Sequence, residues 1–262
     1  MYHRTRFLRL VASIVIGFVS VASAAAITGR EVMEEARDQD MGQTSHALIE
    51  MRLIEEDGDE SLRVIEQYGK ELADGVSGSV MIFHSPASVE GTRFLTITHD
   101  AGADDQWIYL PALRRVRRIA SSERDSEFMG TDFTYSDLAG GNIDDSTHQL
   151  LREESVDGEA TYVVESTPTP DSALTYSRLI QWVSQEKWLP IRVEFYDQDG
   201  ELLKINTMTR IELVQGRWTV IANEMRNVQS GHSTVILVQR WVYDEQLPDS
   251  LFSTNFLRTG RP

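Results

Sequence analysis

The sequence predicts a mainly β protein with about a dozen antiparallel strands and one clear helix. Short segments in which apolar and polar residues alternate recur along the chain. Gly, Asp, Ser or Pro residues separate them at the spacing typical of sandwiches and barrels. Helices do not alternate with these segments, which excludes a doubly wound parallel sheet. Because no shift in composition marks a boundary, we expect residues 27–262 to form a single domain.

Residues 1–26 carry the features of a cleaved secretory signal peptide. Three arginines precede an apolar run over residues 10–21, and small residues near Ala24 and Ala26 fit an A-x-A cleavage pattern. An uncleaved membrane anchor is the alternative, but the run is shorter than the roughly 20 residues that a spanning helix needs. We therefore expect an exported, periplasmic protein that is not an integral membrane protein after cleavage.

Composition limits the functions that are open to the chain. There is no cysteine, so thiol catalysis, zinc–thiolate sites and disulfides are excluded. The formal net charge is −16, and removal of the three arginines of the signal peptide takes it to about −19. A surface of this charge repels nucleic acid and anionic membranes, and we expect no nucleic acid among the partners.

Residues 27–40 are expected to form an amphipathic helix at the start of the mature chain. Thr28 can cap this helix, and Glu31 stands three residues later, as in a capping box. The apolar residues of the segment fall on one narrow stripe, which is the face that a neighbouring element would cover. Met41-Gly42 then ends the helix.

After the helix the pattern changes to a period of two, and the strands follow in two groups. The strands predicted in the first group are residues 47–53, 61–70, 80–84, 92–98 and 106–110. The second group is a meander joined by short turns such as Asp157-Gly158. Its predicted strands are residues 147–154, 160–166, 177–184, 191–196, 202–213, 218–227 and 234–243. Residues 249–256 are expected to form a last helical turn.

A long irregular segment, residues 121–145, separates the two groups of strands. It is polar and acidic, yet it contains Phe128, Met129, Phe133, Tyr135 and Leu138. An irregular segment of this length in a compact domain is usually functional or disordered. Its aromatic residues favour docking onto the rest of the protein.

Several strands carry apolar residues on both faces. Within residues 177–184, Ile180 and Trp182 lie on one face and Leu179 and Val183 on the other. An antiparallel sheet with one face in water alternates more cleanly. The sheet is therefore either covered on both faces or uses one face to line an apolar cavity, and a packed core is the more common arrangement.

The sequence lacks the motifs of known enzyme classes. Its histidines do not stand at metal-ligand spacing, and there is no G-x-S-x-G elbow, phosphate-binding loop or EF-hand pattern. Acidic clusters such as residues 55–57 lie at turns, where solvated acids are expected. We therefore expect no catalytic residue, metal or cofactor, and a hydrolase would need a carboxylate pair that only folding brings together.

Four arginines stand within five residues of an otherwise acidic chain: Arg114, Arg115, Arg117 and Arg118. They have three possible roles, which are pairing with nearby acids, binding of an anionic headgroup, and docking of an acidic partner. Pairing is favoured because acids are close in sequence and arginine–carboxylate pairs are strong when shielded from water. Strand alternation points Arg114 and Arg118 to one face and Arg115 and Arg117 to the other.

Internal pairing of these arginines would clasp the irregular segment, which holds Phe133 and Tyr135, to the sheet. The candidate acids are Asp132, Asp137 and those of residues 123–127. This hypothesis predicts that Asp132 or Asp137 lies within salt-bridge reach of at least one of the four arginines. If all four point into solvent, the docking hypothesis replaces it.

Three stretches resemble a known family: W-I-Y-L-P-A-L-R-R-V-R-R-I at 107–119, F-M-G-T-D-F-T-Y-S-D-L at 128–138, and L-P-D-S-L-F-S-T-N-F-L at 247–257. They resemble the LolA-like family of outer-membrane lipoprotein-sorting proteins, in particular the branch associated with resistance-nodulation-division-type exporters. The order of signal peptide, short helix and strands is similar as well, so the resemblance covers essentially the whole mature chain. The arginine-rich and D-F-T-Y-S-D-L stretches depart from the best-known lipoprotein carriers.

The resemblance implies an unclosed, strongly curved antiparallel half-barrel with the N-terminal helix and a loop as its lid. Its concave face would be apolar and would hold acyl chains, each buried CH₂ contributing roughly 0.8 kcal/mol. The residues expected to line this cavity are Met51, Leu53, Val64, Phe94, Trp107, Tyr109, Trp182, Phe195 and Trp241.

The function expected from these observations is that of a periplasmic carrier or accessory protein. It would bind the acyl chains of a lipid or lipoprotein and pass them between envelope complexes, with a resistance-nodulation-division-type exporter as a further partner. The alternative is a ligand-free interaction partner of an exporter, with a filled core and docking through residues 121–145. A cavity beneath the helix of residues 27–40 would favour the carrier.

Overall fold

The computed structural model describes residues 26–73, 75–99, 102, 104–139, 142–170, 172 and 174–262. The expected signal peptide and its cleavage site near Ala24 lie outside these residues. Within the described part of the chain, no helix is both long enough and apolar enough to cross a bilayer.

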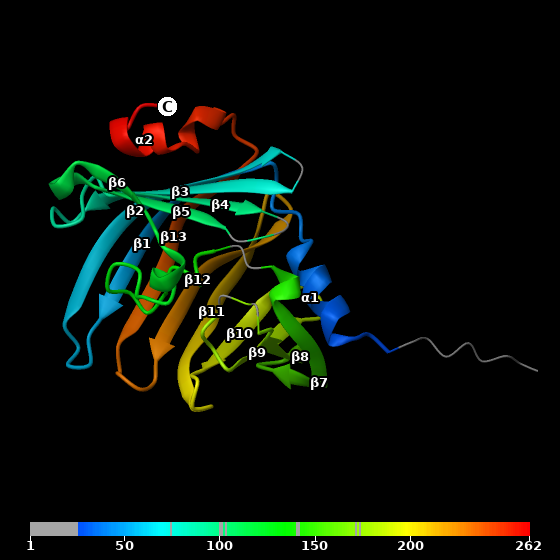
Figure 1. The fold of residues 1–262 in the computed structure, drawn as a ribbon. Coiled ribbons are helices and arrows are strands. Elements are labelled where there is room, and N and C mark those ends of the chain that lie inside the picture. The colour runs from blue at the N-terminus through cyan, green and yellow to red at the C-terminus, as the bar shows by residue number, and fades with distance from the viewer. Residues whose placement is uncertain are drawn as a thin grey trace, which may run out of the picture.

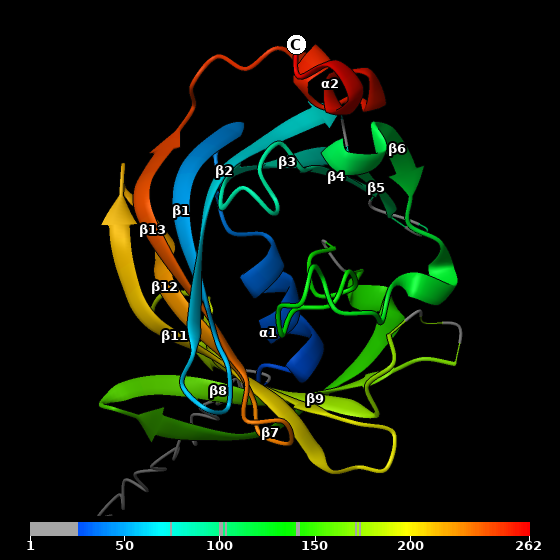
Figure 2. The same cartoon turned by 90° about the vertical axis from the view of Figure 1, so that its left-hand side faces the viewer.

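One antiparallel sheet of thirteen strands curves into a half-barrel that does not close (Figures 1 and 2). The strands lie in the order β6-β5-β4-β3-β2-β1-β13-β12-β11-β10-β9-β8-β7. Their bounds are β1 Thr44–Ile54, β2 Glu60–Ala73, β3 Val76–Ser85, β4 Arg93–His99, β5 Asp105–Leu110, β6 Arg115–Arg118, β7 Ser146–Val156, β8 Glu159–Pro168, β9 Arg178–Ser184, β10 Pro190–Tyr196, β11 Leu202–Val214, β12 Arg217–Asn227 and β13 Ser233–Tyr243.

The connectivity places the open seam of the half-barrel between two strands that are consecutive in the chain. Neighbours in the sheet are successive strands, except that β1 pairs with β13 and joins the two ends of the strand series. The edge strands are therefore β6 and β7. Residues 119–139 and 142–145 lie between these two edge strands in the chain, and Figure 2 shows the first of these stretches inside the curve.

The helix α1 (Gly29–Arg37) lies inside the half-barrel against β7 and β8 (Figure 2). Thr28 caps it, with its hydroxyl accepting from the Glu31 amide while the Glu31 carboxylate accepts from the Thr28 amide. Val32 is fully buried against the sheet. Gly29 lies so close to β7 that a Cβ there would stand 2.5 Å from the Leu150 nitrogen. The expected helix is present but shorter than residues 27–40.

The helix α2 (Thr254–Thr259) and the preceding 3₁₀ turn η4 (Asp249–Leu251) cover the outer face of β3–β6. Phe252 and Phe256 pack there against Val80 and Leu95, all of them buried. In this half of the molecule the sheet is thus covered on both faces, by α2 outside and by the irregular segment inside. This double cover accounts for strands of this half that are apolar on both sides, such as β4 with Phe94 inside and Leu95 outside.

The predicted fold class is confirmed: the protein is mainly β, with an unclosed antiparallel half-barrel and an N-terminal helix. The twelve expected strands are all present. A thirteenth strand, β6, which was not among those predicted, is formed by the arginine-rich segment. It is an edge strand of the sheet. Arg114 precedes it in the left-handed conformation, with φ of 47°, and so belongs to a turn rather than to a strand.

Candidate functional site: the inner face of the half-barrel

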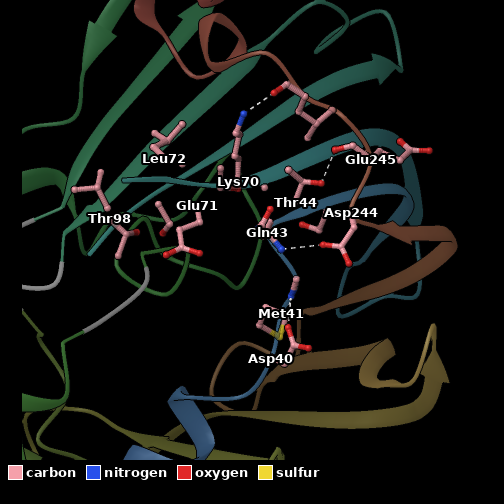
Figure 3. A pocket seen from close by; sticks show the side chains of 18 of the residues that line it. Asp40, Met41, Gln43, Thr44, Lys70, Glu71, Leu72, Thr98, Asp244 and Glu245 are labelled. Atoms are coloured by element: carbon pink, nitrogen blue, oxygen red, sulfur yellow. Dashed lines mark hydrogen bonds between the residues drawn. The ribbon is translucent and has the colours of Figure 1, made fainter. Parts of the chain in front are cut away.

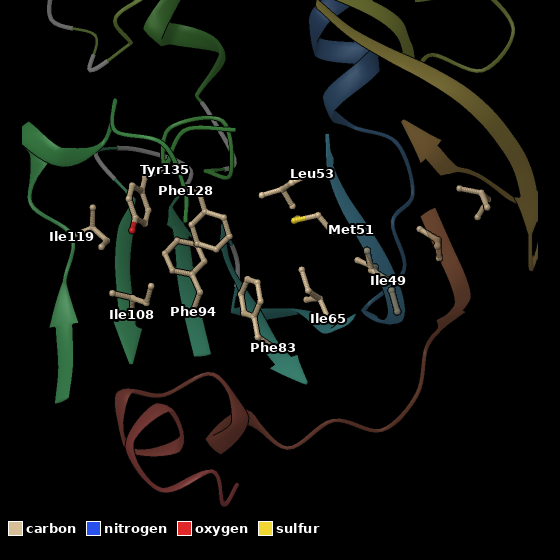
Figure 4. Packing of buried hydrophobic residues seen from close by; sticks show 13 residues of the cluster. Ile49, Met51, Leu53, Ile65, Phe83, Phe94, Ile108, Ile119, Phe128 and Tyr135 are labelled. Carbon is tan, nitrogen blue, oxygen red and sulfur yellow. The ribbon is translucent and has the colours of Figure 1, made fainter. Parts of the chain in front are cut away.

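The inner face of β1–β5 forms a continuous apolar wall (Figure 4). A strand sends alternate side chains to one face, and the register aligns Ile49 with Ile65 and Phe94 with Ile108 across neighbouring strands. All of the wall side chains are buried. They are Ala47, Ile49, Met51 and Leu53 on β1, Ile65 on β2, Phe83 on β3, Phe94 on β4 and Ile108 on β5.

Aromatic rings of residues 119–139, here called the inner loop, cover this wall. The Phe128 ring lies 4.9 Å from Phe94 and 5.5 Å from Tyr135 between centroids, the latter at 86°. Figure 4 shows both loop rings against the wall. Within the loop, the Phe128 amide donates to the Phe133 carbonyl at 2.7 Å. The protein's own side chains therefore occupy the place where the apolar wall would meet a ligand.

A buried ion pair fastens the inner loop to β11. Lys204 Nζ lies 2.5 Å from Asp137 Oδ2, with only 3% and 6% of the two side chains exposed. Lys204 also donates to the Asp132 carbonyl at 2.8 Å, and the Tyr176 hydroxyl donates to Asp137 Oδ1 at 2.9 Å. We call Lys204, Asp137 and Tyr176 the latch. A pair shielded in this way is costly to break, at about 3–5 kcal/mol for loss of one partner.

The surroundings of the latch are largely aromatic. Lys204 Nζ lies 5.2 Å from the ring centroids of both Tyr176 and Phe195. Burial, together with the neighbouring Asp137 carboxylate, strongly raises the pKa of the Tyr176 hydroxyl. That hydroxyl therefore keeps its proton and remains a donor to Asp137. Each member of the latch is hydrogen-bonded in a region of low polarity, where such bonds are strongest.

A second anchor holds the inner loop to β13. Asp132 Oδ2 lies 2.7 Å from both His232 Nδ1 and the Thr234 hydroxyl, which donates to it. The Asp132 amide in turn donates to Thr234 Oγ1 at 3.0 Å. The Asp132 side chain is only 4% exposed. Residues 132–137 are thus pinned to the strands on the far side of the barrel from β6.

Two further bonds reach the inner loop from the wall itself. The Gln106 amide donates to the Tyr135 carbonyl at 2.8 Å, and Arg63 donates to the Met129 carbonyl at 2.8 Å. Gln106 is almost completely buried, and burial lowers the pKa of Arg63. The loop is therefore held by side chains that contact its backbone as well as by packing of its rings.

The arginine cluster does not form the predicted bonds to Asp132 and Asp137, whose carboxylates pair with His232 and Lys204 instead. The reason is geometric, because the inner loop leaves the β6 edge and crosses the interior before these aspartates appear. Arg117 pairs with Glu123, at 2.5 and 2.6 Å to its two oxygens. The predicted pairing with an acid of residues 123–127 therefore exists, at the start of the inner loop.

The other three arginines differ in position: Arg118 lies on the outer face of β6, Arg115 has the phase of Arg117, and Arg114 lies in the preceding turn. Arg118 pairs with Asp105 and lies over the Trp107 ring. Partial burial disfavours the charge on Asp105, but the hydrogen bonds from Arg118 and His99 hold its pKa below the usual range. Arg114 and Arg115 are exposed and form no ion pair with any described residue.

The alternation predicted for this segment holds for the residues within β6. Val116 packs on the outer face with Trp107 and Tyr109. Ile119, three residues later, joins the inner wall. Two adjacent arginines of one strand therefore serve opposite faces, as the period of two requires.

The structure separates the nine residues that were expected to line the cavity. Five lie on the inner face in contact with the wall, the latch or the inner loop: Met51, Leu53, Phe94, Phe195 and Trp241. Four lie on the outer face: Val64, Trp107, Tyr109 and Trp182. The latter four cannot line the interior.

Three of the four outer residues have contacts that cover them on the outer face. Trp107 and Tyr109 pack with the cluster beneath α2, and the Arg93 guanidinium lies 5.2 Å from the Tyr109 ring. Trp182 lies under Arg192 and donates its indole N–H to Glu154. Val64 stands opposite Glu50, one residue out of phase with Ile65. The apolar character of Trp107, Tyr109 and Trp182 therefore reflects packing on the outer face.

An open pocket of about 1780 Å³ lies at the end of the half-barrel where the chain runs from α1 into β1 (Figure 3). Small polar side chains line much of it, such as Ser45, Ser77 and Ser79, next to Trp241 and Glu71. Its volume exceeds the roughly 300–1,000 Å³ of common small-molecule pockets. The interior thus combines a covered apolar wall with an open, more polar end.

The far end of the inner face is covered by α1. Val32 is packed there against Val164 and Val183, all three fully buried. The stacked pair Tyr162 and Trp188, with centroids 5.7 Å apart, borders this cluster. The helix therefore covers β7–β9, while the inner loop covers β1–β5.

The arrangement is suited to holding apolar groups. In the described part of the chain, His, Asp and Glu side chains form no cluster of three that could hold a metal ion. The two buried carboxylates of the inner loop, Asp132 and Asp137, accept from defined partners in the second anchor and the latch. The chemistry available on the inner face is burial of apolar surface, controlled by how firmly the loop is fastened.

Sequence reasoning missed the residues that fasten the loop, namely Lys204, Tyr176 and His232. Lys204 offered one signal, because it is a lone lysine between Leu203 and Ile205 in a strand. A lysine is almost never fully buried unless it is paired. Its partner is 67 positions away in the chain, so the pairing had no local signature.

Comparison with known proteins finds matches that cover most of the chain. A family model described as an uncharacterized protein matches residues 75–259. Among curated proteins, none matches the chain.

Solved structures give the more informative similarities. A DUF1329 family protein from Desulfovibrio piger is 31% identical, with a TM-score of 0.84 over 87% of this chain and 97% of its own. A putative outer membrane lipoprotein-sorting protein domain from Vibrio parahaemolyticus is 34% identical, with a TM-score of 0.83 over 88% and 98%. A LolA superfamily protein from Nitrosomonas europaea is 25% identical, with a TM-score of 0.69 over 88% and 100%.

Proposed function

Because the chain belongs to the LolA-like family of outer-membrane lipoprotein-sorting proteins, we propose that it is a periplasmic carrier of acyl chains. Its cargo would be a lipid or a lipoprotein, bound on the inner face of the half-barrel and passed between envelope complexes. The observation that carries the proposal is the apolar wall of β1–β5, which is covered by an irregular loop rather than by a packed layer of secondary structure.

The inner loop would have to leave the wall when an acyl chain enters. Three loop rings, Phe128, Phe133 and Tyr135, are buried in the closed state, and exposing them costs roughly 5–9 kcal/mol at about 1.5–3 kcal/mol each. Breaking the latch adds about 3–5 kcal/mol. A chain of roughly fifteen methylenes would gain about 12 kcal/mol by burial. The two amounts are similar, which suits reversible loading and release.

The open pocket supports a route for cargo. It adjoins Trp241, which packs against the wall cluster, and it opens at the end of the half-barrel. An acyl chain could therefore reach the wall from this end while its polar headgroup stays among Ser45, Ser77 and Ser79. An amphiphile that enters here would place its apolar part on the wall and its polar part among the serines, in agreement with the polarity of the lining.

A second candidate function is that of a ligand-free interaction partner of an exporter. The observation that favours it is that loop rings already fill the wall, so the interior is packed without a ligand. Association with a resistance-nodulation-division-type exporter remains a prediction from the resemblance of the sequence. Detection of acyl chains at the wall decides between the two functions.

The test is uptake of a photoactivatable fatty acid, followed by crosslinking and peptide mapping of the full mature chain. The carrier predicts adducts on the inner-face peptides of β1–β5 and on the inner loop. Met51→Glu, on the inner face, should abolish labelling, whereas Val64→Glu, on the outer face of the adjacent strand, should retain it. Native mass spectrometry of gently purified protein should show bound lipid.

Absence of uptake, with wild-type protein that stays empty in native mass spectra, would contradict the carrier. In that case capture of an exporter through the inner loop would support the second function. Labelling confined to outer-face peptides would contradict the location of the site while leaving lipid binding intact.

A further inference from the structure

Charge is unevenly distributed over this acidic protein. Residues 106–122 and 250–262 contain no Asp or Glu and together hold six arginines, in a chain whose formal net charge is −16. The helix α2 packs against β4, β5 and β6, so the two acid-free stretches lie together, as Figure 1 shows. We call this region the basic end.

Most arginines of the basic end are free to meet an external anion. Arg117 and Arg118 are engaged with Glu123 and Asp105. The other four are exposed and, within the described residues, form no ion pair; these are Arg114, Arg115, Arg258 and Arg261. Unpaired arginines in a chain so rich in acids are candidates for recognition of phosphate.

The turn between β5 and β6 projects an apolar side chain beside these charges. Leu113 is 68% exposed, the highest value among the large apolar residues that the structure describes. The turn is tight, since the Arg114 amide donates to the Pro111 carbonyl at 3.1 Å. Pro111 packs close to Gly91 of the neighbouring turn. We call residues 111–115 the basic tip.

We propose that the basic tip, with the arginines of α2, docks on the surface of an anionic phospholipid bilayer. Leu113 would insert among the acyl chains, and Arg114 and Arg115 would bind lipid phosphates. One exposed leucine alone would need no explanation. A projecting leucine flanked by unpaired cations matches the combination of apolar insertion and electrostatic attraction that binds proteins to bilayer interfaces.

The charge distribution favours a bilayer over an acidic protein as the occupant. The basic end offers a projecting tip, which a fluid interface accommodates without a complementary groove. The rest of the surface is acidic and is repelled by anionic lipid. Only one orientation is therefore attractive. The net charge predicted repulsion from membranes as a whole, and the basic end is the local exception.

This proposal goes beyond the carriage of acyl chains and does not depend on it, because residues 112–115 of the basic tip are exposed and none of the tip belongs to the inner wall. Vesicle binding tests it without any cargo. A fatty-acid probe reports uptake into the interior, whereas a dye at the basic tip reports docking on the surface, so the two activities are measured separately.

The test uses an environment-sensitive dye on Leu113→Cys, which is a unique label because the chain has no cysteine. Leu213→Cys is the matched control, since Leu213 is 59% exposed at the β11–β12 turn, next to Glu212. With vesicles that contain phosphatidylglycerol, the dye at position 113 should shift to the blue and the dye at 213 should not. Vesicles of phosphatidylcholine alone should give no shift.

Charge variants supply the second measurement, by sedimentation with vesicles. Arg114→Gln/Arg115→Gln should lower the apparent affinity for the vesicles roughly 25-fold, because loss of each charge lowers it about fivefold. Glu90→Gln, on the turn that contacts Pro111, should raise it. Rising salt should weaken wild-type binding.

Failure of wild-type protein to sediment with phosphatidylglycerol vesicles would overturn the proposal. Equal shifts at positions 113 and 213, or equal binding of the double arginine variant, would do the same. If the basic end instead captures an acidic protein with no response to vesicles, the bilayer is the wrong occupant.

Discussion

The substitution Lys204→Met removes one partner of the latch and probes how the inner loop is held. Lys204 and Asp137 are shielded from water, with 3% and 6% of their side chains exposed. Methionine keeps most of the apolar volume of lysine but no charge. Asp137 would then be left with the Tyr176 hydroxyl and the Thr134 amide as its donors.

The expected loss is about 3–5 kcal/mol, the cost of leaving one charge of a buried pair without its partner. Because the latch joins the inner loop to β11, we expect this loss to fall mainly on local opening of the loop. At about 1.4 kcal/mol for each factor of ten, the open population should rise by a factor of roughly 10² to 4 × 10³.

Hydrogen exchange of the loop amides measures this population directly. The Phe128 amide, bonded to the Phe133 carbonyl at 2.7 Å, and the Tyr135 amide should exchange faster by that factor. The matched control is Arg210→Met on the same strand, since the Arg210–Glu212 pair is more than half exposed. Such a surface pair is worth about 0–1 kcal/mol, so the control should leave exchange nearly unchanged.

Wild-type exchange rates in Lys204→Met would refute the role of the latch, as would an equal effect of Arg210→Met. The double variant Lys204→Met/Asp137→Leu adds a check, because replacement of both charges by apolar groups often restores stability. It should recover much of the protection that the single variant loses.

Three further substitutions test other parts of the fold. Gly29→Ala should displace α1 and destabilise the protein in urea unfolding, because the new Cβ would stand 2.5 Å from the Leu150 nitrogen. Phe128→Ala should cost about 3–5 kcal/mol in the same assay and speed the uptake of fatty acid. The lowered pKa of Asp105 means that its pairing with Arg118 stabilises the fold above the ordinary aspartate pKa of about 3.9. That contribution is lost as pH falls through the lower folded pKa, so the roughly 0.5–1 kcal/mol gap between wild type and Asp105→Asn at pH 7 should shrink and then vanish as the pH falls below the ordinary aspartate pKa.

The strands were predictable because their side chains alternate over a sheet and their turns carry Gly and Asp. Thr28 and Glu31 likewise marked the start of α1, and their capping box exists. Which side chains of a strand point into the half-barrel was harder to predict. Trp107 and Tyr109 have the apolar character of interior residues, but α2 covers them from outside. When both faces of a sheet are covered, composition no longer distinguishes inner from outer.

The fastening of the inner loop could not be predicted from local patterns. Proximity in sequence favoured pairing of Asp137 with the arginines some twenty residues before it. The structure instead joins it to Lys204, 67 positions later, because the loop crosses the barrel to reach β11. Long-range ion pairs follow from topology, and the strand order that places β6 and β7 at opposite edges has no local signature in the sequence.

The central claim is that acyl chains and the inner loop compete for the apolar wall of β1–β5. Asp132→Cys/Thr234→Cys tests it most directly, since the two side chains already meet at 2.7 Å and the chain has no other cysteine. Uptake of a fluorescent fatty acid is measured with the disulfide formed and again after reduction. We predict no uptake by the oxidised protein and full uptake after reduction. Equal uptake in the two states would show that cargo binds without moving the loop and would contradict the account.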